Sequence, residues 1–421
     1  FAILSVMFTA AGCAHVDRTD RQDDGGAADC SVEPDRVEQA GLRTQKKLRR
    51  WLRFLRGRGS KRRLAVESYP GRNEPIARRS YLYDNALALL WSAWIGKRRR
   101  ARALARTLIA TQREDGSWSF SIDFSGQAPT PTARVRTGAV AWAAHALSYF
   151  EHRAGGRRVR RAVDRAVEYL IEQRYSPDRR HLAGLIGPGR WVDGPTPKMA
   201  VTEHQIDAHM VLRSHRPGPA DALRERILEA LWMPDEGRFA VAVHEDGLDS
   251  KRALDASGAW GALWLQSLGR PHLARRSFAY VLQSFRVRHD GFVGYRPYRD
   301  AVGQYDALDR DHVFTEGSFS VGLAAHRLGH DLVARRMVRL GAELNCRRGP
   351  GIPYSTVDVT NFPTDRAAAS SLWYLFLERE WRTGEVAPLF TGFDRGSTRT
   401  EATGAAEEEA GRAVTLRRGD R

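Results

Sequence analysis

Six residues near the middle of the chain, Thr202-Glu203-His204-Gln205-Ile206-Asp207, are the starting point for predicting the fold. Thr202 can cap a helix N-terminus, because its side-chain oxygen can accept a hydrogen bond from a backbone N–H that the first turn leaves free. Glu203 and Asp207 are four residues apart, so both carboxylates lie on one face of the expected helix. Mostly apolar residues follow at 208–212. This pattern predicts a buried helix whose N-terminal end is acidic.

The same arrangement recurs along the chain as pairs of helices separated by long loops. In each pair, a short link joins an apolar helix to an amphipathic one. One further apolar helix over 364–378 and one polar-faced helix over 37–58 bring the predicted number to twelve. The five predicted pairs are 81–95 with 97–112, 136–150 with 157–173, 202–213 with 220–232, 254–268 with 271–285, and 315–328 with 332–344.

The two types of helix predict an inner and an outer layer. A helix that is apolar all round belongs in an interior, whereas a helix with arginines on one face belongs in an outer shell. We therefore predict an all-α domain over residues 37–385, folded as an (α/α)6 toroid of six helical hairpins. The N-terminal helix closes the ring as the partner of the last apolar helix. An open solenoid of hairpins is the alternative architecture.

The loops between the pairs are long, and all of them lead into the N-termini of inner helices, so they share one rim. Short β-prone runs such as 238–243 predict small β-hairpins beside that rim. Long loops inside a compact domain usually carry function. These loops are rich in glycine and aromatic residues, whose rings suit the apolar faces of sugars. We expect Trp118, Trp191 and Tyr305 to contact a substrate.

Most of the predicted inner helices begin with a carboxylate. Helix capping and the helix dipole both favour acids at such positions, which is the structural alternative to a catalytic role. Together, however, these residues converge on one central funnel. Crowded like charges raise one another's pKa, so one carboxylic acid stays protonated beside an ionised neighbour, as glycoside hydrolysis requires. The residues at the helix starts are Asp84, Arg136, Glu203 with Asp207, Asp255, Glu316 and Asp365.

This pattern resembles the six-hairpin glycosidase superfamily, whose members fold as (α/α)6 barrels and mostly cleave or rearrange saccharides. The resemblance spans about residues 81–378. It implies a glycoside hydrolase that acts on a poly- or oligosaccharide through paired carboxylates at the barrel rim. The stretches that carry it are Tyr83-Asp84-Asn85-Ala86-Leu87-Ala88, Thr202-Glu203-His204-Gln205-Ile206-Asp207, Leu254-Asp255, Thr315-Glu316-Gly317 and Asn361-Phe362-Pro363-Thr364.

Under this resemblance Glu203 is our candidate general acid. Asp84 or Glu316, each from a different hairpin, is the candidate base or water-orienting group. Glu203 and Asp207 are not expected to form the catalytic pair, because neighbours on one helix face cannot bracket a glycosidic bond. The expected substrate-binding groups at the helix starts are Asp207, Asp255, Arg136, which suits an acidic sugar, and His204.

Two other functional classes fit the same barrel. A sugar epimerase or isomerase of similar fold uses histidines, and His204 and His312 are positioned at the rim. A non-catalytic glycan-binding or assembly lipoprotein is the second class. The stretch 112–118 resembles the Gln-Trp repeat of terpenoid cyclases, but it occurs once, whereas those enzymes use several copies. Without a zincin spacing, a phosphate loop or a dinucleotide fingerprint, we expect neither a metal nor a cofactor.

Both ends of the chain differ in composition from the helical region. Residues 1–13 resemble the end of a lipoprotein-type signal in which Cys13 is lipidated, with a plain secretory signal as the alternative. Residues 14–36 are acidic and glycine-rich, as expected of a flexible tether. Residues 386–421 are predicted to be disordered. We therefore expect a cell-envelope lipoprotein outside the cytoplasm, or a secreted protein. The three cysteines are too few for a disulfide framework, and no disulfide is predicted.

The formal net charge of +17 comes mainly from arginines on the predicted helix surfaces. The densest cluster lies at 46–63, where apolar residues recur at helical spacing. Such a basic amphipathic helix near a lipid anchor can rest on an anionic membrane surface. No stacking platform or nucleic-acid motif accompanies the charge, so nucleic acid is not an expected partner. We expect a monomer.

Overall fold

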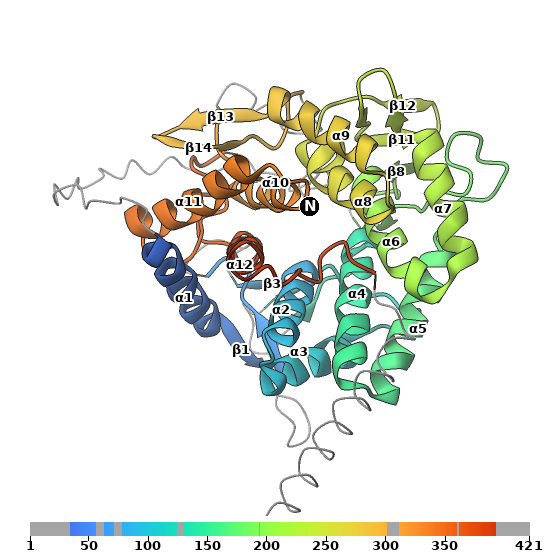
Figure 1. Ribbon diagram of the computed structural model, residues 1–421. Helices are drawn as coiled ribbons and strands as arrows, with labels where there is room; N and C mark the ends of the chain where they lie inside the picture. Colours follow the sequence, from blue (N-terminus) through green and yellow to red (C-terminus); the bar gives the residue numbers. More distant parts are fainter. Residues whose placement is uncertain are drawn as a thin grey trace, which may run out of the picture.

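The computed structural model describes residues 34–55, 63–70, 78–123, 130–192, 194–300, 311–359 and 362–392. Within these residues the chain forms twelve α-helices, one π-helical turn and fourteen short strands (Figure 1). All the strand pairs are antiparallel and belong to sheets of two or three strands. The predictions of twelve helices and of small antiparallel sheets are therefore confirmed.

Six of the helices form an inner layer in which each contacts the next. The contacts run from α2 to α4, α6, α8, α10 and α12, and α12 returns to contact α2. These helices are buried on nearly every face, as their apolar sequences predict. Their bounds are α2 (Leu82–Trp94), α4 (Thr137–Ala154), α6 (Thr202–His215), α8 (Trp260–Ser267), α10 (Thr315–Arg327) and α12 (Ala368–Thr383).

The other six helices pack outside this ring, and five of them follow an inner helix directly. The sixth, α1, contacts both α11 and α12, so it closes the outer layer as the partner of the last inner helix. These helices bury one face and expose another that is rich in arginine, as α5 shows. Their bounds are α1 (Pro34–Arg50), α3 (Arg98–Thr111), α5 (Arg157–Glu172), α7 (Pro217–Ala230), α9 (Pro271–Ser284) and α11 (Asp331–Arg348).

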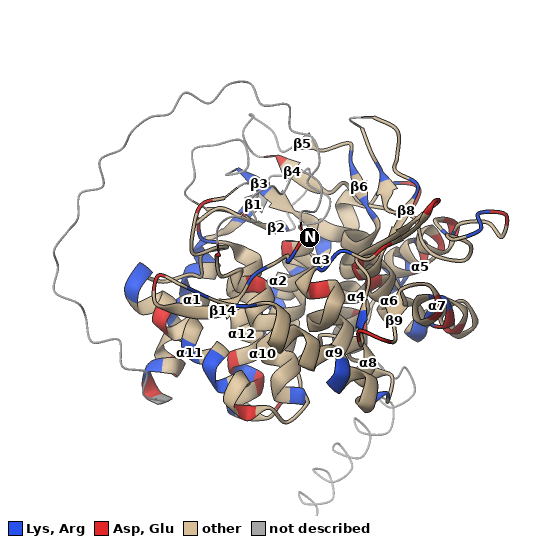
Figure 2. Ribbon diagram, turned by 90° about the horizontal axis from the view of Figure 1, so that it is seen from above, with Lys and Arg blue, Asp and Glu red and all other residues tan. Residues whose placement is uncertain are grey.

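The strands lie in the long connections that lead from an outer helix to the next inner helix. In the view of Figure 2, the strands from β1 to β6 and β8 gather at one end of the helical ring. The first seven strands are β1 (Leu52–Leu55), β2 (Arg63–Val66), β3 (Arg79–Tyr81), β4 (Ser121–Asp123), β5 (Thr130–Pro131), β6 (Val135–Arg136) and β7 (Gly189–Arg190). The others are β8 (Met199–Val201), β9 (Trp232–Met233), β10 (Arg238–Phe239), β11 (Ala242–His244), β12 (Gly247–Asp249), β13 (Arg286–His289) and β14 (Phe292–Tyr295).

The prediction of a basic helix over 46–63 is wrong. Helix α1 ends at Arg50, and β1 follows it and pairs antiparallel with β2, with Leu52 opposite Val66. Trp51 is buried at this turn, 3% exposed, and the backbone N–H of Glu67 donates to its carbonyl at 2.9 Å. The strand partner and the buried ring therefore override the helical spacing of the apolar residues. Within the described residues of this stretch, helix extends only to Arg50 and strand follows over Leu52–Leu55.

One expected helix cap and one expected helix start also differ from prediction. Thr202 does not cap α6, because it lies inside the first turn and its hydroxyl donates to the carbonyl of Ala240 at 2.5 Å. Helix α12 begins at Ala368 rather than at 364, so Asp365 precedes the helix. The intervening residues pair with the preceding loop, where Arg366 forms an antiparallel bridge with Pro353.

Aromatic rings fill the axis of the inner ring. Tyr83, Trp142, Trp260 and Trp373 come from α2, α4, α8 and α12, and each is at most 2% exposed. The rings of Trp260 and Trp373 stack at 6.1 Å between centroids. Trp142 meets Trp260 edge-on at 5.6 Å and Tyr83 at 5.3 Å. We call these four residues the axial cluster.

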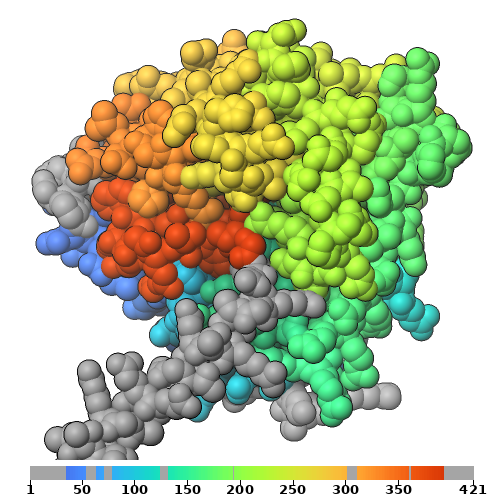
Figure 3. Space-filling view, turned by 45° about the vertical axis from the view of Figure 1, so that its right-hand side comes forward, coloured from blue at the N-terminus to red at the C-terminus, as the bar shows by residue number. Residues whose placement is uncertain are grey.

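The chain after α12 adds a further ring to the axial cluster. Phe390 is fully buried and lies 5.8 Å from Trp142 and from Trp260 between ring centroids. Ala387 and Leu389 are also fully buried. Residues 386–392, which the sequence analysis assigned to a disordered tail, are described by the structure, and residues 387–390 are buried. Figure 3 shows this C-terminal part of the described chain (red) packed against the neighbouring hairpins.

Three basic side chains hold residues 387–390 through backbone carbonyls. Arg327 donates to Leu389 at 2.6 Å and to Ala387 at 2.9 Å, while it also pairs with Glu380 at 2.7 Å. Arg213 donates to the carbonyl of Phe390 at 3.2 Å. The third contact joins His145 Nε2 to the carbonyl of Pro388 at 2.9 Å.

Cys346, near the end of α11, is disulfide-bonded, so the expectation of no disulfide is wrong. Its partner lies outside the described residues, as do residues 1–33 with the predicted signal, Cys13 and most of the tether. The first residues of α1 overlap the end of the predicted tether. Over the part of the chain that the structure describes, every helix is too short or too polar to cross a membrane.

We predict that Phe390→Ala lowers the free energy of unfolding by about 3–5 kcal/mol, because it removes a fully buried ring and leaves a cavity in the axial cluster. Urea denaturation measures this change. Val386→Ala is the matched control, since Val386 is 58% exposed and should change stability by less than about 0.5 kcal/mol. Equal losses in the two variants would show that the segment does not stabilise the ring.

Candidate active site at the N-terminal ends of the inner helices

The first two turns of the inner helices bring five carboxylates to the same end of the ring. Asp84 lies in α2, Glu203 and Asp207 in α6, Asp255 in the π-helical turn (Asp255–Ala259) that precedes α8, and Glu316 in α10. All five are buried, with exposed fractions between 2% and 8%. Capping does not account for them, because these helices have no side-chain cap hydrogen bond.

The charge of Glu203 acts on three of the other carboxylates. Burial raises the pKa of Asp207 well above its ordinary value, and the negative charge of Glu203 raises it further. Burial likewise raises the pKa of Asp255, with the charges of Glu203 and Glu316 adding to the effect. Glu203 also contributes to the raised pKa of Glu316. The carboxylates are therefore close enough to interact, as the sequence pattern predicted.

Two of the carboxylates have a pKa close to neutrality. Burial raises the pKa of Asp84 to about 7, and a hydrogen bond with Ser68 opposes part of that rise. Burial also raises the pKa of Glu316 to about 7, where the hydrogen bond from Tyr83 lowers it and the charge of Asp84 raises it. Such groups can both hold and release a proton at neutral pH.

Tyr83 links the axial cluster to the carboxylates, a role that the sequence analysis did not assign. Its hydroxyl donates to Oε1 of Glu316 at 2.9 Å and accepts from Nε1 of Trp373 at 2.6 Å. Burial and the charge of Glu316 raise the pKa of Tyr83 well above its ordinary value, so the hydroxyl keeps its proton. The adjacency of Tyr83 to Asp84 was the available signal in the sequence.

His204 and Asp207 present polar atoms without partners. Both side chains are buried, and neither Nδ1 of His204 nor Oδ1 of Asp207 has a hydrogen-bond partner. Gly138 in α4 allows this packing, since a Cβ there would lie 2.4 Å from Cδ2 of His204 and 2.9 Å from Oδ2 of Asp207. Burial, aided by the positive charge of Arg136, lowers the pKa of His204 to about 3, so its ring is neutral.

Arg136 and several aromatic rings lie above these groups in the rim loops. The Arg136 guanidinium lies 4.3 Å from the ring centroid of Phe120. Phe120 contacts Tyr81, which contacts Tyr69, and Tyr69 in turn contacts Tyr354. Phe120, Tyr81 and Tyr69 are only partly buried. The sequence analysis identified this rim as aromatic but did not select these three residues, whose contacts depend on how separate loops pack.

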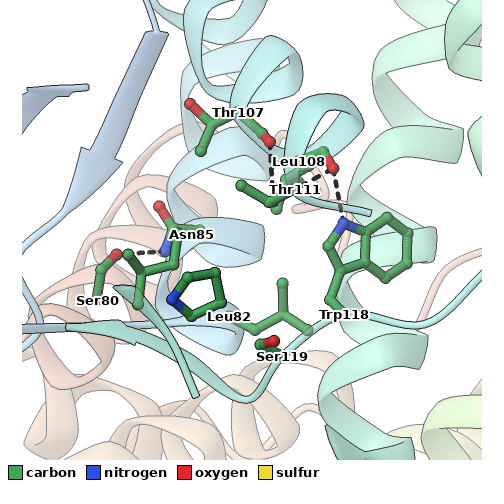
Figure 4. Close-up of a pocket in the computed structure, with 10 residues that line it drawn as sticks. Ser80, Leu82, Asn85, Thr107, Leu108, Thr111, Trp118 and Ser119 are labelled. Carbon is green, nitrogen blue, oxygen red and sulfur yellow. Dashed lines mark hydrogen bonds between the residues drawn. The ribbon is translucent and has the colours of Figure 1, made fainter. Parts of the chain in front are cut away.

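Trp118 is not at this site, contrary to prediction. It is 1% exposed, and its indole N–H donates to the carbonyl of Leu108 at 2.7 Å. It lines a small cavity of about 20 Å³ beside α3 (Figure 4), which is room for about one water molecule. Gly116 (φ +84°) lies in the turn before Trp118. A Cβ atom added to Gly116 would lie 2.2 Å from the carbonyl oxygen of Arg165 in α5, so this turn requires glycine. The 112–118 stretch therefore follows α3 in the chain and packs against α5.

The remaining predicted residues fall in different places. Trp191 follows β7, the strand that pairs with the Arg136 strand β6, and the Arg134 guanidinium lies 4.8 Å from its ring centroid. Tyr305 lies outside the described residues. His312 is buried against Phe362, with ring centroids 5.2 Å apart. Within the described chain no group of three or more His, Cys, Asp or Glu side chains could hold a metal ion.

Comparison with solved structures shows the fold. A D-mannose isomerase matches with a TM-score of 0.62 at 10% identity, over 85% of this chain and all of that one. A glycosidase variant in complex with glucose matches with a TM-score of 0.58 at 15% identity, over 84% of this chain and 98% of that one. An unsaturated glucuronyl hydrolase from a Bacillus species matches with a TM-score of 0.53 at 12% identity, over 86% and 100% of the two chains.

These similarities show that the chain shares the helical toroid fold of these solved structures. No family model matches the sequence, and no curated protein matches it either.

We predict that Asp84→Asn and Glu316→Gln each stabilise the protein above neutral pH. In the unfolded chain both carboxyls ionise near their ordinary pKa of about 4, whereas in the folded protein they ionise near 7. Their contribution to stability is therefore full below about pH 4 and is lost as the pH rises through 7. The amide side chains of the variants do not ionise, so the variants do not lose stability in this way as the pH rises.

Urea denaturation at about pH 4 and about pH 8 tests this expectation. Each amide variant should gain on the order of 2 kcal/mol relative to wild type between the two conditions. Glu229→Gln is the control, because the Glu229 side chain is 71% exposed, and its difference from wild type should hardly depend on pH. If the difference in free energy of unfolding between Asp84→Asn and wild type were also the same at both pH values, the raised pKa of Asp84 would be contradicted.

Proposed function

We propose that this protein is a carbohydrate-active enzyme, and that it is a glycoside hydrolase with an (α/α)6 barrel of six hairpins. The observation that carries the proposal is the ring of five buried, interacting carboxylates at the N-terminal ends of the inner helices. Hydrolysis of a glycosidic bond needs one carboxylic acid that is protonated and one carboxylate that is ionised. Burial raises the pKa of four of these five carboxyl groups, and mutual repulsion adds to the rise at three of them, which favours a protonated acid among them.

The environment of each carboxylate suggests its role. Asp84 and Glu316, with a pKa of about 7, suit the general acid that protonates the leaving oxygen. Glu203 supplies the negative charge that acts on its neighbours, so it suits the base or nucleophile. This assignment reverses the roles that we expected from the sequence. Glu203 lies on α6, whereas both candidate acids lie on other hairpins, so the pair can bracket a bond.

Substrate recognition would use the unpartnered atoms and the rim. Oδ1 of Asp207 and Nδ1 of His204 are available for sugar hydroxyls. Phe120, Tyr81 and Tyr69 offer partly exposed rings for the apolar faces of a sugar. Arg136 adds a positive charge that suits an acidic sugar. The solved relatives include a glycosidase variant crystallised with glucose, which supports a saccharide as the ligand.

A sugar isomerase is the second candidate, and the neutral His204 favours it. A buried imidazole with a free Nδ1 can accept a proton from a sugar carbon, and the carboxylic acid of Asp207 lies beside it. The similarity in fold to a D-mannose isomerase is consistent with this chemistry.

We predict that Glu203→Gln lowers the rate of reducing-end release by about 10²–10⁴-fold, because the amide cannot act as base or nucleophile. The measurement uses a panel of neutral and acidic oligosaccharides. In the wild type, the rate should fall as the pH rises through about 7, because the general acid loses its proton. The variant in which this fall disappears, Asp84→Asn or Glu316→Gln, identifies the acid. Glu225→Gln, an exposed change on α7, should keep wild-type activity.

Unchanged turnover by Glu203→Gln would refute the assignment. The isomerase reading predicts a different result, in which deuterium from heavy water enters a sugar carbon without cleavage and His204→Gln abolishes the exchange. Binding of saccharides without either reaction would point to the non-catalytic alternative.

We also propose that the protein is an extracytoplasmic lipoprotein attached at Cys13. The disulfide of Cys346 supports an oxidising compartment, where such bonds persist. Mass spectrometry of the mature N-terminal peptide from the native host should show a diacylglyceryl group on Cys13. An unmodified Cys13 in the mature chain would rule out the anchor.

A further inference from the structure

A cleft of about 410 Å³ lies on the outer surface between α11 and the β13–β14 hairpin. Arginines line it from both sides, with Arg288 on β13 and Arg335, Arg336 and Arg339 on α11. Arg335 and Arg339 are four residues apart and therefore share a face of the helix. Glu343 is the one acidic residue that lines the cleft. None of the five carboxylates of the candidate active site lines it, so the two sites are separate.

The side chains of these four arginines make no hydrogen bond or ion pair within 4.0 Å in the described chain, although the charge of Arg339 acts on Glu343. Some arginines on other outer helices are paired, as Arg160 of α5 is with Glu151 at 2.6 Å. Unpaired charges of one sign on a concave surface focus the electrostatic field and attract anions. Figure 2 shows basic residues (blue) along α11 at the outside of the ring.

The cleft also has an apolar component that an inorganic anion would not use. Leu340 and the partly buried Val293 lie among the arginines, and Leu332 at the start of α11 is 80% exposed. A sugar ring can place its C–H face on such side chains while its acidic group meets a guanidinium. Basic walls on two sides fit a chain lying between them, whereas a planar membrane contacts a convex surface.

We propose that this cleft binds a strand of acidic polysaccharide through its carboxylate or sulfate groups. The cleft acts as a second saccharide site and holds the polymer on the protein away from the carboxylate ring. The choice of a saccharide as the anion rests on the proposed function, whereas the attraction of an anion rests on the arginines alone.

Isothermal titration with polygalacturonate, and with neutral dextran as the uncharged probe, tests the proposal. Arg335→Ala combined with Arg339→Ala should raise the Kd for polygalacturonate roughly tenfold. The control is Arg98→Ala combined with Arg102→Ala on α3, which removes the same charge from exposed helix positions outside the cleft. The control should change the Kd by less than about twofold, and dextran should not bind the cleft.

Several results would overturn the proposal. Equal weakening in both double variants would mean that net charge, and not the cleft, attracts the polymer. Absence of polygalacturonate binding would also overturn it. Binding to vesicles of equimolar phosphatidylglycerol and phosphatidylcholine that depends on Arg335 and Arg339, without polygalacturonate binding, would instead identify a membrane-binding surface.

Glu203→Gln separates this proposal from the catalytic one. That variant should lose turnover but keep the wild-type Kd for polygalacturonate. Wild-type protein that binds the polymer at the cleft but hydrolyses nothing would refute the proposed hydrolase and leave the cleft assignment intact. Hydrolysis by the wild-type protein, together with an unchanged Kd for polygalacturonate in the Arg335→Ala and Arg339→Ala double variant, would support the hydrolase and refute the cleft assignment.

Discussion

Six helices packed side by side enclose an axis that has to be filled, and the rings of Tyr83, Trp142, Trp260 and Trp373 fill it. Each ring comes from a different inner helix, so their edge-on and stacked contacts fix how those helices are rotated about their own axes. Aromatic pairs of this kind contribute about 0.5–1.5 kcal/mol each beyond the area that they bury. Because Tyr83 and Asp84 are adjacent, the same packing also determines where a carboxylate points. Tyr83 then extends the arrangement to Glu316 through a hydrogen bond.

The carboxylate ring is the part of the molecule that opposes folding. An ionised carboxylate without a partner is costly to bury, and the usual response is a raised pKa. The raised pKa of Asp84, Asp207, Asp255 and Glu316 shows that response in four neighbouring groups. A stable apolar framework offsets this cost, which is typical of sites that keep strained or repelling groups for function. Burial lowers the pKa of His204 instead of raising it, and the result is again an uncharged side chain.

Local patterns in the sequence were sufficient to predict the helices and the convergence of their first turns. Helices that are apolar on every face indicate an inner layer, and acids at their starts indicate one shared end. Contacts between distant segments were not predictable in this way. Leu52 has helical spacing from Leu48 but pairs as a strand with Val66, and only the folded chain supplies that partner.

Other differences have the same origin. Residues 386–390 are mostly apolar but form a run too short to show a period, and Phe390 enters the axial cluster. The position of Trp118 depends on a turn at Gly116 that fits against α5, and no local pattern encodes that contact. The hydrogen bond from Tyr83 to Glu316 joins residues 233 positions apart.

The closure of the outer layer by α1 has a consequence for how the chain is made. Thr44 in α1 donates a hydrogen bond to Asn345 in α11, 301 residues later, at 2.9 Å. Helix α1 also contacts α12, and residues 387–390 complete the axis after that. A ribosome releases α1 long before these partners, so the hairpins made in between leave the exit tunnel with apolar faces that nothing yet covers. Ring closure therefore has to wait until residues 387–390 have left the exit tunnel, and the apolar faces of the earlier hairpins are exposed to aggregation until then.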